Sequence, residues 1–331
     1  MRPTFDPYTV HRELEIIRND LHCNAIKIQG FDVSNIIRTA KDALGDDLFD
    51  EVWLAPEMFD QDQEQTLQYT VKAAEQSEKL RSEWSSQTQI VFSVGTELTG
   101  FMQGIAEGNN MMERFTNPNF RENWRAGKYV KLLNDYLSKV SKAVREVFNG
   151  KITYASLPRI ETVDWSLFDY VCIDAYRDRF TKSSYDEWVK RYFKYGKPVV
   201  VGEFGCCTYR GAEDLGGMGW DIVDFSKMPP ELKGNYVYDQ GLQAQELSTQ
   251  LQILDDVGVH GAFIFTFIQP LDLTNDPGML KMLQRITFDP DISSYSLVKS
   301  YPDGRHGAAY PDMTWEPKLS FRAVADYFAK Y

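Results

Sequence analysis

Two glutamates in this chain each stand at the end of a hydrophobic run. Residues 198–205, PVVVGEFG, deliver Glu203, and residues 89–97, QIVFSVGTE, deliver Glu97. Consecutive β-branched residues without polar alternation are typical of a strand buried on both faces, which favours a parallel sheet covered by helices. Because the carboxyl ends of parallel strands meet at one end of a barrel, we expect the two carboxylates to converge there.

A pair of carboxylates in that position suits the cleavage of a glycosidic bond. One acid donates a proton to the leaving group, while the other attacks the sugar or directs a water molecule. Ionised Glu203 would favour the protonated form of a neighbouring Glu97. For cleavage with retention we expect the carboxyl groups about 5 to 5.5 Å apart. The structural alternative is that each glutamate pairs with an arginine or a lysine.

The rest of the chain alternates strands with helices, which indicates βα units and a parallel sheet with right-handed crossovers. We predict seven core strands, over residues 22–30, 51–56, 89–97, 151–156, 170–176, 198–205 and 261–267. We predict helices over residues 9–20, 33–44, 63–84, 122–148, 185–195, 238–257 and 317–328, the last with a proline in its first turn.

These elements predict an α/β fold of the (β/α)8 TIM-barrel class, in one domain over residues 1–331. A barrel of eight strands needs one more than the sequence displays, because residues 1–8 carry no strand pattern. Either the first strand is missing, or a later segment such as SYSLVKSY, 294–301, replaces it. The connections that leave the strands near 97, 203 and 267 are long, and such loops build the active sites of parallel barrels.

The two glutamate runs resemble those of a known superfamily. VFSVGTE on the fourth strand and VVVGEFG on the seventh are similar to the retaining (β/α)8 glycoside hydrolases. The resemblance implies that Glu97 is the acid/base, that Glu203 is the nucleophile, and that the partner is a carbohydrate or glycoside. More narrowly, DLHCNAIKIQGFD, VDWSLFDYVCIDAYRD, GEFGCCTYRGA and WEPKLSF resemble proteins labelled "abortive infection protein", a label from which no chemistry follows.

The chain departs from the superfamily at two positions. Thr96 stands where an asparagine usually holds the sugar 2-hydroxyl, and a hydroxyl lacks the reach of an amide. The tryptophan usual on the eighth strand is absent from GAFIFTFIQP, where Phe265, Phe267 and Gln269 are the nearest candidates. Tyr176 matches the place where such barrels often put a tyrosine that hydrogen-bonds the nucleophile. Its alternative is a rim aromatic with the hydroxyl in water.

Other polar residues gather at the predicted strand ends. Asp174 lies beside Tyr176, in a cluster with Arg177 and Asp178 that is also typical of an ion-pair network. Lys27 and Glu57 end the first two strands, where they either bind sugar hydroxyls or form exposed loop charge. Our candidate substrate-binding residues are Thr96, Tyr176, Lys27, Glu57, Asp174, Phe267 and Gln269.

Composition excludes several classes of partner. The net charge of −12, spread along the chain, argues against nucleic acid and anionic membrane. No run is apolar enough to span a bilayer and no signal region opens the chain, so we expect a cytoplasmic protein. Cys206 and Cys207 lack a histidine motif that would activate them, and neither a zinc spacing nor a phosphate loop occurs, so we expect no metal and no cofactor. The oligomeric state is not indicated.

Two hypotheses follow. The first is a retaining O-glycoside hydrolase that uses Glu97 and Glu203, with a sugar that the sequence does not name. The second, which Thr96 keeps open, is a glycosidase-like barrel that binds a ligand or catalyses a non-hydrolytic reaction.

Overall fold

The computed structural model describes residues 5–45, 48–84, 88–269, 285–301 and 303–330. Within them the chain divides into two compact units. Unit 1 comprises Met1–Cys23, Tyr176–Arg191 and Glu203–Tyr331, and unit 2 comprises Asn24–Ala175 and Tyr192–Gly202. That the whole chain forms one domain stays a prediction.

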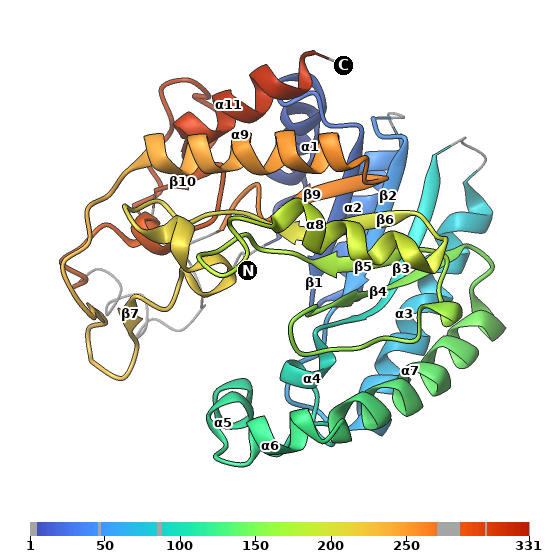
Figure 1. Cartoon of the computed structure of the whole chain (residues 1–331). Coiled ribbons are helices and arrows are strands. Elements are labelled where there is room, and N and C mark those ends of the chain that lie inside the picture. The colour runs from blue at the N-terminus through green and yellow to red at the C-terminus, as the bar shows by residue number, and fades with distance from the viewer. Residues whose placement is uncertain (1–4, 46–47, 85–87, 270–284, 302, 331) are drawn as a thin grey trace. The chain divides into compact units, whose positions relative to one another are not determined.

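A seven-stranded sheet runs through the described residues, with each strand beside its predecessor in the chain (Figure 1). Its strands in order are β1 (Ala25–Gly30), β2 (Glu51–Pro56), β3 (Gln89–Thr96), β4 (Lys151–Ser156), β5 (Val171–Asp174), β6 (Val199–Phe204) and β9 (Gly261–Ile264). The pairs from β1 to β5 are parallel. All seven lie within the stretches that the sequence predicts, and this order without skipped neighbours is the one that successive βα units produce.

The strands that carry the two glutamates are buried throughout. Every residue of β6 is buried, and so is every residue of β3 after Gln89. This explains their uninterrupted apolar runs, since both faces of each strand are covered. The last four residues of β2 and of β5 are buried as well.

The sequence left two alternatives for the eighth strand, and the described residues fit the first, a missing strand. Within them β1 pairs only with β2, and the first described element, Pro7–Asn19, is a helix. The segment 294–301 does not join the sheet. Instead, β10 (Val298–Ser300) pairs antiparallel with β11 (Trp315–Pro317) in a separate two-stranded sheet.

The helices follow the strands, as the alternation predicts. They are α1 (Pro7–Asn19), α2 (Val33–Gly45), α3 (Gln63–Glu83), α4 (Leu98–Phe101), α5 (Met111–Thr116), α6 (Phe120–Arg125), α7 (Lys128–Val147), α8 (Tyr185–Lys190), α9 (Gln240–Val257) and α11 (Leu319–Phe328). In unit 2, α3 and α7 pack together, and in unit 1 α9 packs on α11 (Figure 1). None of the described helices is long and apolar enough to cross a membrane.

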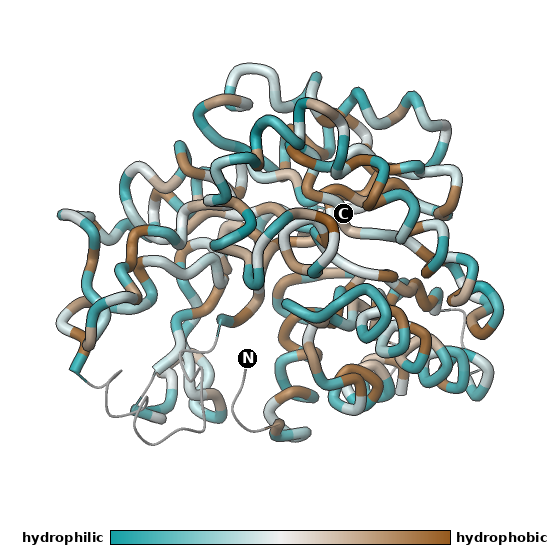
Figure 2. The backbone as a smooth tube through the Cα atoms, turned by 90° about the horizontal axis from the view of Figure 1, so that it is seen from below, coloured by the Kyte–Doolittle hydropathy of each residue, from teal (hydrophilic) through white to brown (hydrophobic). Residues whose placement is uncertain are grey.

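Local sequence explains where the helices begin and end. Asp62 and Gln65 form a capping box at the start of α3, and Gly258, at φ 77°, ends α9. The buried side of α7 recurs every three or four residues, the helical period, and consists of Tyr129, Leu133, Tyr136, Leu137, Val140, Ser141 and Val144. Hydrophobic and hydrophilic stretches accordingly alternate along the helical turns of the backbone (Figure 2).

Three predicted helices differ from the structure. The helix expected over 185–195 is α-helical only to Lys190 and continues as a 3-10 helix, Arg191–Tyr195. The helix expected over 122–148 is divided into α6 and α7, because Gly127 adopts φ 73°, outside the helical region. The helix expected from residue 317 begins at Leu319, because Pro317 ends β11 and Lys318 is the N-cap residue.

Candidate functional site

In unit 1, Glu203 lies near the carboxyl end of β6 and is 8% exposed. The hydroxyl of Tyr176, in the segment that follows β5, donates a hydrogen bond to Glu203 Oε2 at 3.0 Å. A phenol that donates a hydrogen bond to a carboxylate fixes its orientation. The contact expected for Tyr176 from the sequence is therefore present in the structure.

A glycine-rich segment packs behind Tyr176. A Cβ added to Gly217 would lie 3.1 Å from the Tyr176 ring, so the backbone approaches the ring closely there. The Tyr295 ring lies edge-on to Tyr176 at 5.7 Å, and its hydroxyl donates to the carbonyl of Gly216 and accepts from the amide of Gly219. The glycines of LGGMGW, 215–220, thus allow a loop to press on the tyrosine that holds Glu203.

The two adjacent cysteines after Glu203 belong to the core of unit 1. Cys206 and Cys207 are buried among Tyr209, Ile222 and Tyr295. The Cys207 thiol donates to the carbonyl of Ser293 at 3.2 Å. Burial raises the pKa of both thiols well above the usual range, which disfavours the nucleophilic thiolate form.

In unit 2, Glu97 follows β3 directly and has an uncommon backbone conformation. Its φ and ψ angles of 44° and 43° lie in the left-handed region, which costs a residue with a Cβ atom about 1 kcal/mol. Its amide donates to the carbonyl of Ala155 at 2.9 Å, and its own carbonyl accepts from the amides of Gly100 and Phe101. These hydrogen bonds hold the backbone from which the carboxylate projects. Such outliers often occur at functional sites.

A buried carboxylate that the sequence analysis missed supports the segment after Glu97. Glu161 is 6% exposed and accepts hydrogen bonds from the amides of Thr99 and Leu157 and from the hydroxyl of Tyr154. The Tyr154 hydroxyl in turn accepts from the amide of Leu98 at 2.8 Å. Burial raises the pKa of Glu161. Glu161 therefore joins the loops that follow β3 and β4.

Thr96 and the charged residues predicted at the first strand ends lie in unit 2. Thr96 is buried as the last residue of β3. The Lys27 ammonium donates to the carbonyl of Gly202 at 3.0 Å, and a Cβ on that glycine would lie 2.8 Å from Asp174 Oδ1. Lys27 and Asp174 thus approach the same residue of β6. Glu57 accepts from the Gln29 amide at 2.5 Å.

Residues predicted after β9 lie in unit 1 and contact the protein itself. The Phe267 ring meets Trp315 edge to face at 5.5 Å, and Gln269 Oε1 accepts from the amide of Tyr295. Arg177 forms a two-pronged pair with Glu246 on α9, at 2.7 and 2.8 Å. This pair is the structural ion-pair alternative that the sequence left open for Arg177.

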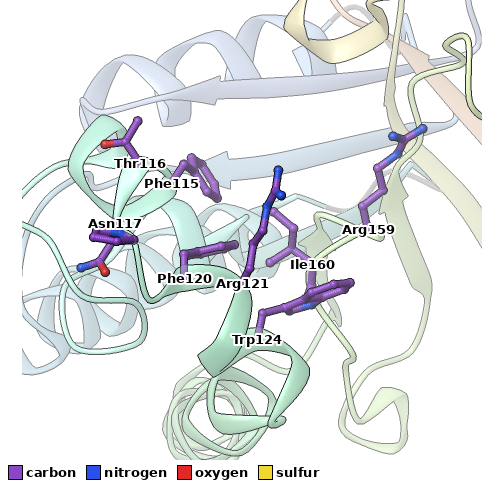
Figure 3. Close-up of a pocket in the computed structure, with 9 residues that line it drawn as sticks. Phe115, Thr116, Asn117, Phe120, Arg121, Trp124, Arg159 and Ile160 are labelled. Carbon is purple, nitrogen blue, oxygen red and sulfur yellow. The ribbon is translucent and has the colours of Figure 1, made fainter.

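A surface pocket of about 470 Å³ lies in unit 2, between α5, α6 and the loop after β4 (Figure 3). Three aromatic side chains and two arginines dominate its lining, namely Phe115, Phe120, Trp124, Arg121 and Arg159. Ile160 completes one wall. The sequence placed one wall of the site in this connection but did not indicate the pocket itself.

Metal coordination finds no support in the part of the chain that is described. Within it, no three His, Cys, Asp or Glu side chains are grouped so that they could hold a metal ion.

Comparison with known proteins gives a fold but no sequence family. No family model matches this chain, and no curated protein matches it. Among solved structures, a GH113 β-1,4-mannanase is 13% identical, with a TM-score of 0.57 over 98% of this chain and 94% of its own. The GH113 β-mannanase AaManA from Alicyclobacillus acidocaldarius, in complex with ManMIm, is 12% identical, with a TM-score of 0.57 over 98% and 92%. A GH2 β-galacturonidase from Eisenbergiella tayi bound to galacturonate has 13% identity and a TM-score of 0.57, over 99% of this chain and 48% of that one.

The fold is that of a TIM barrel. The likeness to the two mannanases extends over nearly the full length of both chains, so the α/β barrel class predicted from the sequence is confirmed. The narrower resemblance to "abortive infection" proteins finds no counterpart among the family models or the curated proteins and stays a prediction.

Proposed function

We propose that this protein is a retaining glycoside hydrolase in which Glu203 is the nucleophile and Glu97 the acid/base. The observation that carries the proposal is the Glu203 carboxylate itself. It is buried at the end of a fully buried strand and receives a hydrogen bond from Tyr176. A carboxylate held in one orientation is what attack on an anomeric carbon requires.

In this mechanism Glu97 protonates the glycosidic oxygen while Glu203 attacks the anomeric carbon. The bond to the leaving group breaks, and a glycosyl ester forms on Glu203. Glu97, now ionised, then takes a proton from water, which attacks the same carbon and releases Glu203. The hydrogen bonds of the Glu97 backbone support this role. A residue that transfers a proton in both steps must keep its carboxyl group in place, and these bonds fix the backbone that carries it.

The substrate is proposed to be a β-glycoside. The structural neighbours include enzymes named for a neutral sugar and for an acidic one. A panel of aryl β-glycosides, including mannosides, glucosides and galacturonides, therefore tests activity first. Hydrolysis of one of them, with retained configuration in the first-formed sugar, is the expected result.

Two variants then test the assigned roles. Glu203→Ala should lose the covalent intermediate with every substrate, because the attacking group is gone. Glu97→Ala should retain the first step with activated aryl glycosides, whose leaving groups need no proton. Added azide should give a product of inverted configuration with Glu203→Ala and of retained configuration with Glu97→Ala. Glu146→Ala, at an exposed position on α7, is the control.

A second candidate function rests on Thr96. This residue is 6% exposed and stands where related barrels usually have an asparagine that holds the sugar 2-hydroxyl. A barrel that binds a glycoside without cleaving it would show saturable binding and no turnover with any member of the panel. Wild-type turnover in both glutamate variants would place the active site elsewhere.

A further inference from the structure

The pocket in unit 2 has a lining that is unusual on an acidic protein. Trp124 and Arg121 come from α6, whereas Arg159 comes from the loop after β4 (Figure 3). Both arginines are exposed residues. Two positive side chains therefore line a single pocket, although the chain as a whole carries a net charge of −12.

Several polar groups around the pocket are already engaged within the protein. The Trp124 indole N–H donates to the carbonyl of Ile160 at 2.9 Å. The Asn117 side-chain amide donates to the carbonyl of Glu107, and the Thr116 hydroxyl donates to the carbonyl of Met112. These side chains are consequently poorly suited to hydrogen-bond individual hydroxyl groups of a ligand. What the pocket offers is ring surface and positive charge.

Arg121 is the group most open to a ligand. It forms no ion pair with any residue in the described part of the chain, and its guanidinium stands over the pocket beside Phe120 and Ile160 (Figure 3). Trp124 is 39% exposed, so part of its indole ring is accessible. A guanidinium and an accessible indole that line one pocket are suited to a ring that carries a carboxylate.

The size of the pocket and its place in the chain narrow the ligand class. About 470 Å³ lies within the ordinary range of small-ligand pockets. The pocket is formed largely by the connection that begins at Glu97 and ends at α7. The apolar face of a pyranose stacks on an indole, while its carboxylate is recognised by arginine.

We propose that this pocket is a binding subsite for a hexuronate, a sugar ring that carries a carboxylate. The inference rests on the proposed glycosidase function, because that function makes a sugar the expected ligand. Trp124 supplies the stacking surface, and Arg121 and Arg159 supply the charge. The site thus adds a preference for acidic substrates or acidic branches to the proposed reaction.

Binding of two matched sugars tests the site without any turnover. The probes are methyl β-D-glucuronide and methyl β-D-glucoside, which differ only in carrying a carboxylate or a hydroxymethyl group. They are titrated into full-length protein that carries Glu203→Gln, and the NMR signal of the Trp124 indole, assigned with Trp124→Phe, reports binding at the pocket. We expect the glucuronide to bind roughly tenfold more tightly than the glucoside.

Two arginines on the same helix provide the matched comparison. Arg121→Gln should weaken glucuronide binding roughly tenfold and leave glucoside binding unchanged. Arg125→Gln, on α6 but outside the pocket lining, should change neither. The glucuronide preference should also shrink as salt is added, because it depends on charge.

Three results would overturn the site: equal affinity for the two sugars, a preference that survives in Arg121→Gln, or benzoate moving the Trp124 signal as strongly as the glucuronide. Failure of the site and failure of the hydrolase are distinguishable. A charge preference that depends on Arg121 in a protein that cleaves no glycoside supports the site and refutes the hydrolase. Retaining hydrolysis with no effect of the glucuronide on the Trp124 signal supports the hydrolase and refutes the site.

Discussion

The two long connections that follow the glutamate strands are held by different interactions. The connection after β3, residues 97–127, depends on buried and half-buried charge. The fully buried Arg114 donates to Asp60 and to the carbonyl of Gly100, both at 2.7 Å, and Glu107 pairs with Lys128. The connection after β6, residues 205–239, depends mainly on a cluster of buried apolar and aromatic side chains. Ion pairs add to it: Asp221 pairs with Lys233 at the surface, and the buried Lys318, from a later segment, pairs with Asp291 and donates to the Thr208 hydroxyl.

The same contrast extends to the two carboxylates. Glu97 is positioned through its backbone, by the left-handed conformation and by the hydrogen bonds of its amide and carbonyl. Glu203 is positioned through its side chain, by the Tyr176 hydroxyl and the aromatic packing behind it. In unit 2 the hydrogen bonds to Glu161 hold the loop after β3 and also support the fold. In unit 1 the hydrogen bond from the Tyr176 hydroxyl goes to a side chain, so removal of this hydroxyl should leave the backbone in place. Damage to the two supports should therefore have different consequences.

The largest expected effect is on stability, from Glu161→Ala. The substitution leaves two buried amides and the Tyr154 hydroxyl without their acceptor. We expect the free energy of unfolding to fall by about 4 kcal/mol, measured by urea denaturation, because each orphaned donor costs of the order of 1 kcal/mol or more. Glu146→Ala removes an exposed carboxylate and should change the value by less than about 0.5 kcal/mol. A similarly small change with Glu161→Ala would refute the supporting role.

The next effect is on activity, from Tyr176→Phe. Removing one hydroxyl takes away the hydrogen bond to Glu203 but keeps the ring that packs against Tyr295. We expect kcat with an aryl glycoside to fall roughly 10- to 100-fold with little change in KM, which corresponds to about 1.4–2.7 kcal/mol. Tyr8→Phe, at an exposed tyrosine, should behave as the wild type. If Tyr176→Phe instead lost as much stability as Glu161→Ala and kept its kcat, Tyr176 would support the fold and would not position Glu203 for the reaction.

The positions of both carboxylates in the chain were predictable from the sequence. Each follows a long apolar run, and a run of that kind identifies the end of a buried strand without further information. The alternation of elements likewise predicts the order of the sheet. These features depend on hydrophobic period and turn residues, which are local properties of the chain.

The supports of the two carboxylates could not be predicted in the same way. Glu161 lies in a short irregular segment, and only the fold brings it to the amide of Thr99, 62 residues earlier. A charged residue such as Arg114 is expected at the surface of an amphipathic segment, but its side chain is fully buried. The interruption at Gly127 was visible in principle, since a glycine within a helical pattern weakens it. The sequence also could not decide between the two alternatives for the eighth strand, because it does not show that residues 298–300 pair with β11 instead of joining the barrel sheet.

A smaller effect distinguishes the backbones at the two glutamates. At position 97 we expect Glu97→Gly to be more stable than Glu97→Ala by about 1 kcal/mol, because glycine accepts the left-handed conformation without a Cβ penalty. At position 203, within β6, the order should reverse, with Glu203→Gly less stable than Glu203→Ala by about 0.5–1 kcal/mol. Thermal or urea unfolding of the four variants measures both differences. The same order at both positions would show that Glu97 is not held in that conformation.

The smallest effect concerns acid. The hydrogen bond from Lys128 lowers the pKa of Glu107 to about 2, and Glu107 also accepts from Tyr129 and Asn123. Because the pKa is lowered in the folded protein, this carboxylate stabilises the connection above its ordinary pKa of about 4.3 and loses the effect as the pH falls through 2. The Trp124 indole NMR signal, on the same connection, should change over that range in the wild type and not in Glu107→Gln.

The control for this prediction lies in the other connection. Trp220 packs against the apolar cluster of unit 1, and its neighbour Asp221 pairs with Lys233, so this connection contains no contact with Glu107 among the described interactions. Its indole signal should therefore follow the same course with pH in the wild type and in Glu107→Gln, and Glu122→Gln should leave both signals as in the wild type. A difference between the wild type and Glu107→Gln that appears equally at Trp220 would mean that Glu107 acts on global stability. A difference confined to Trp124 would show that charge, and hence pH, controls the order of the connection after Glu97.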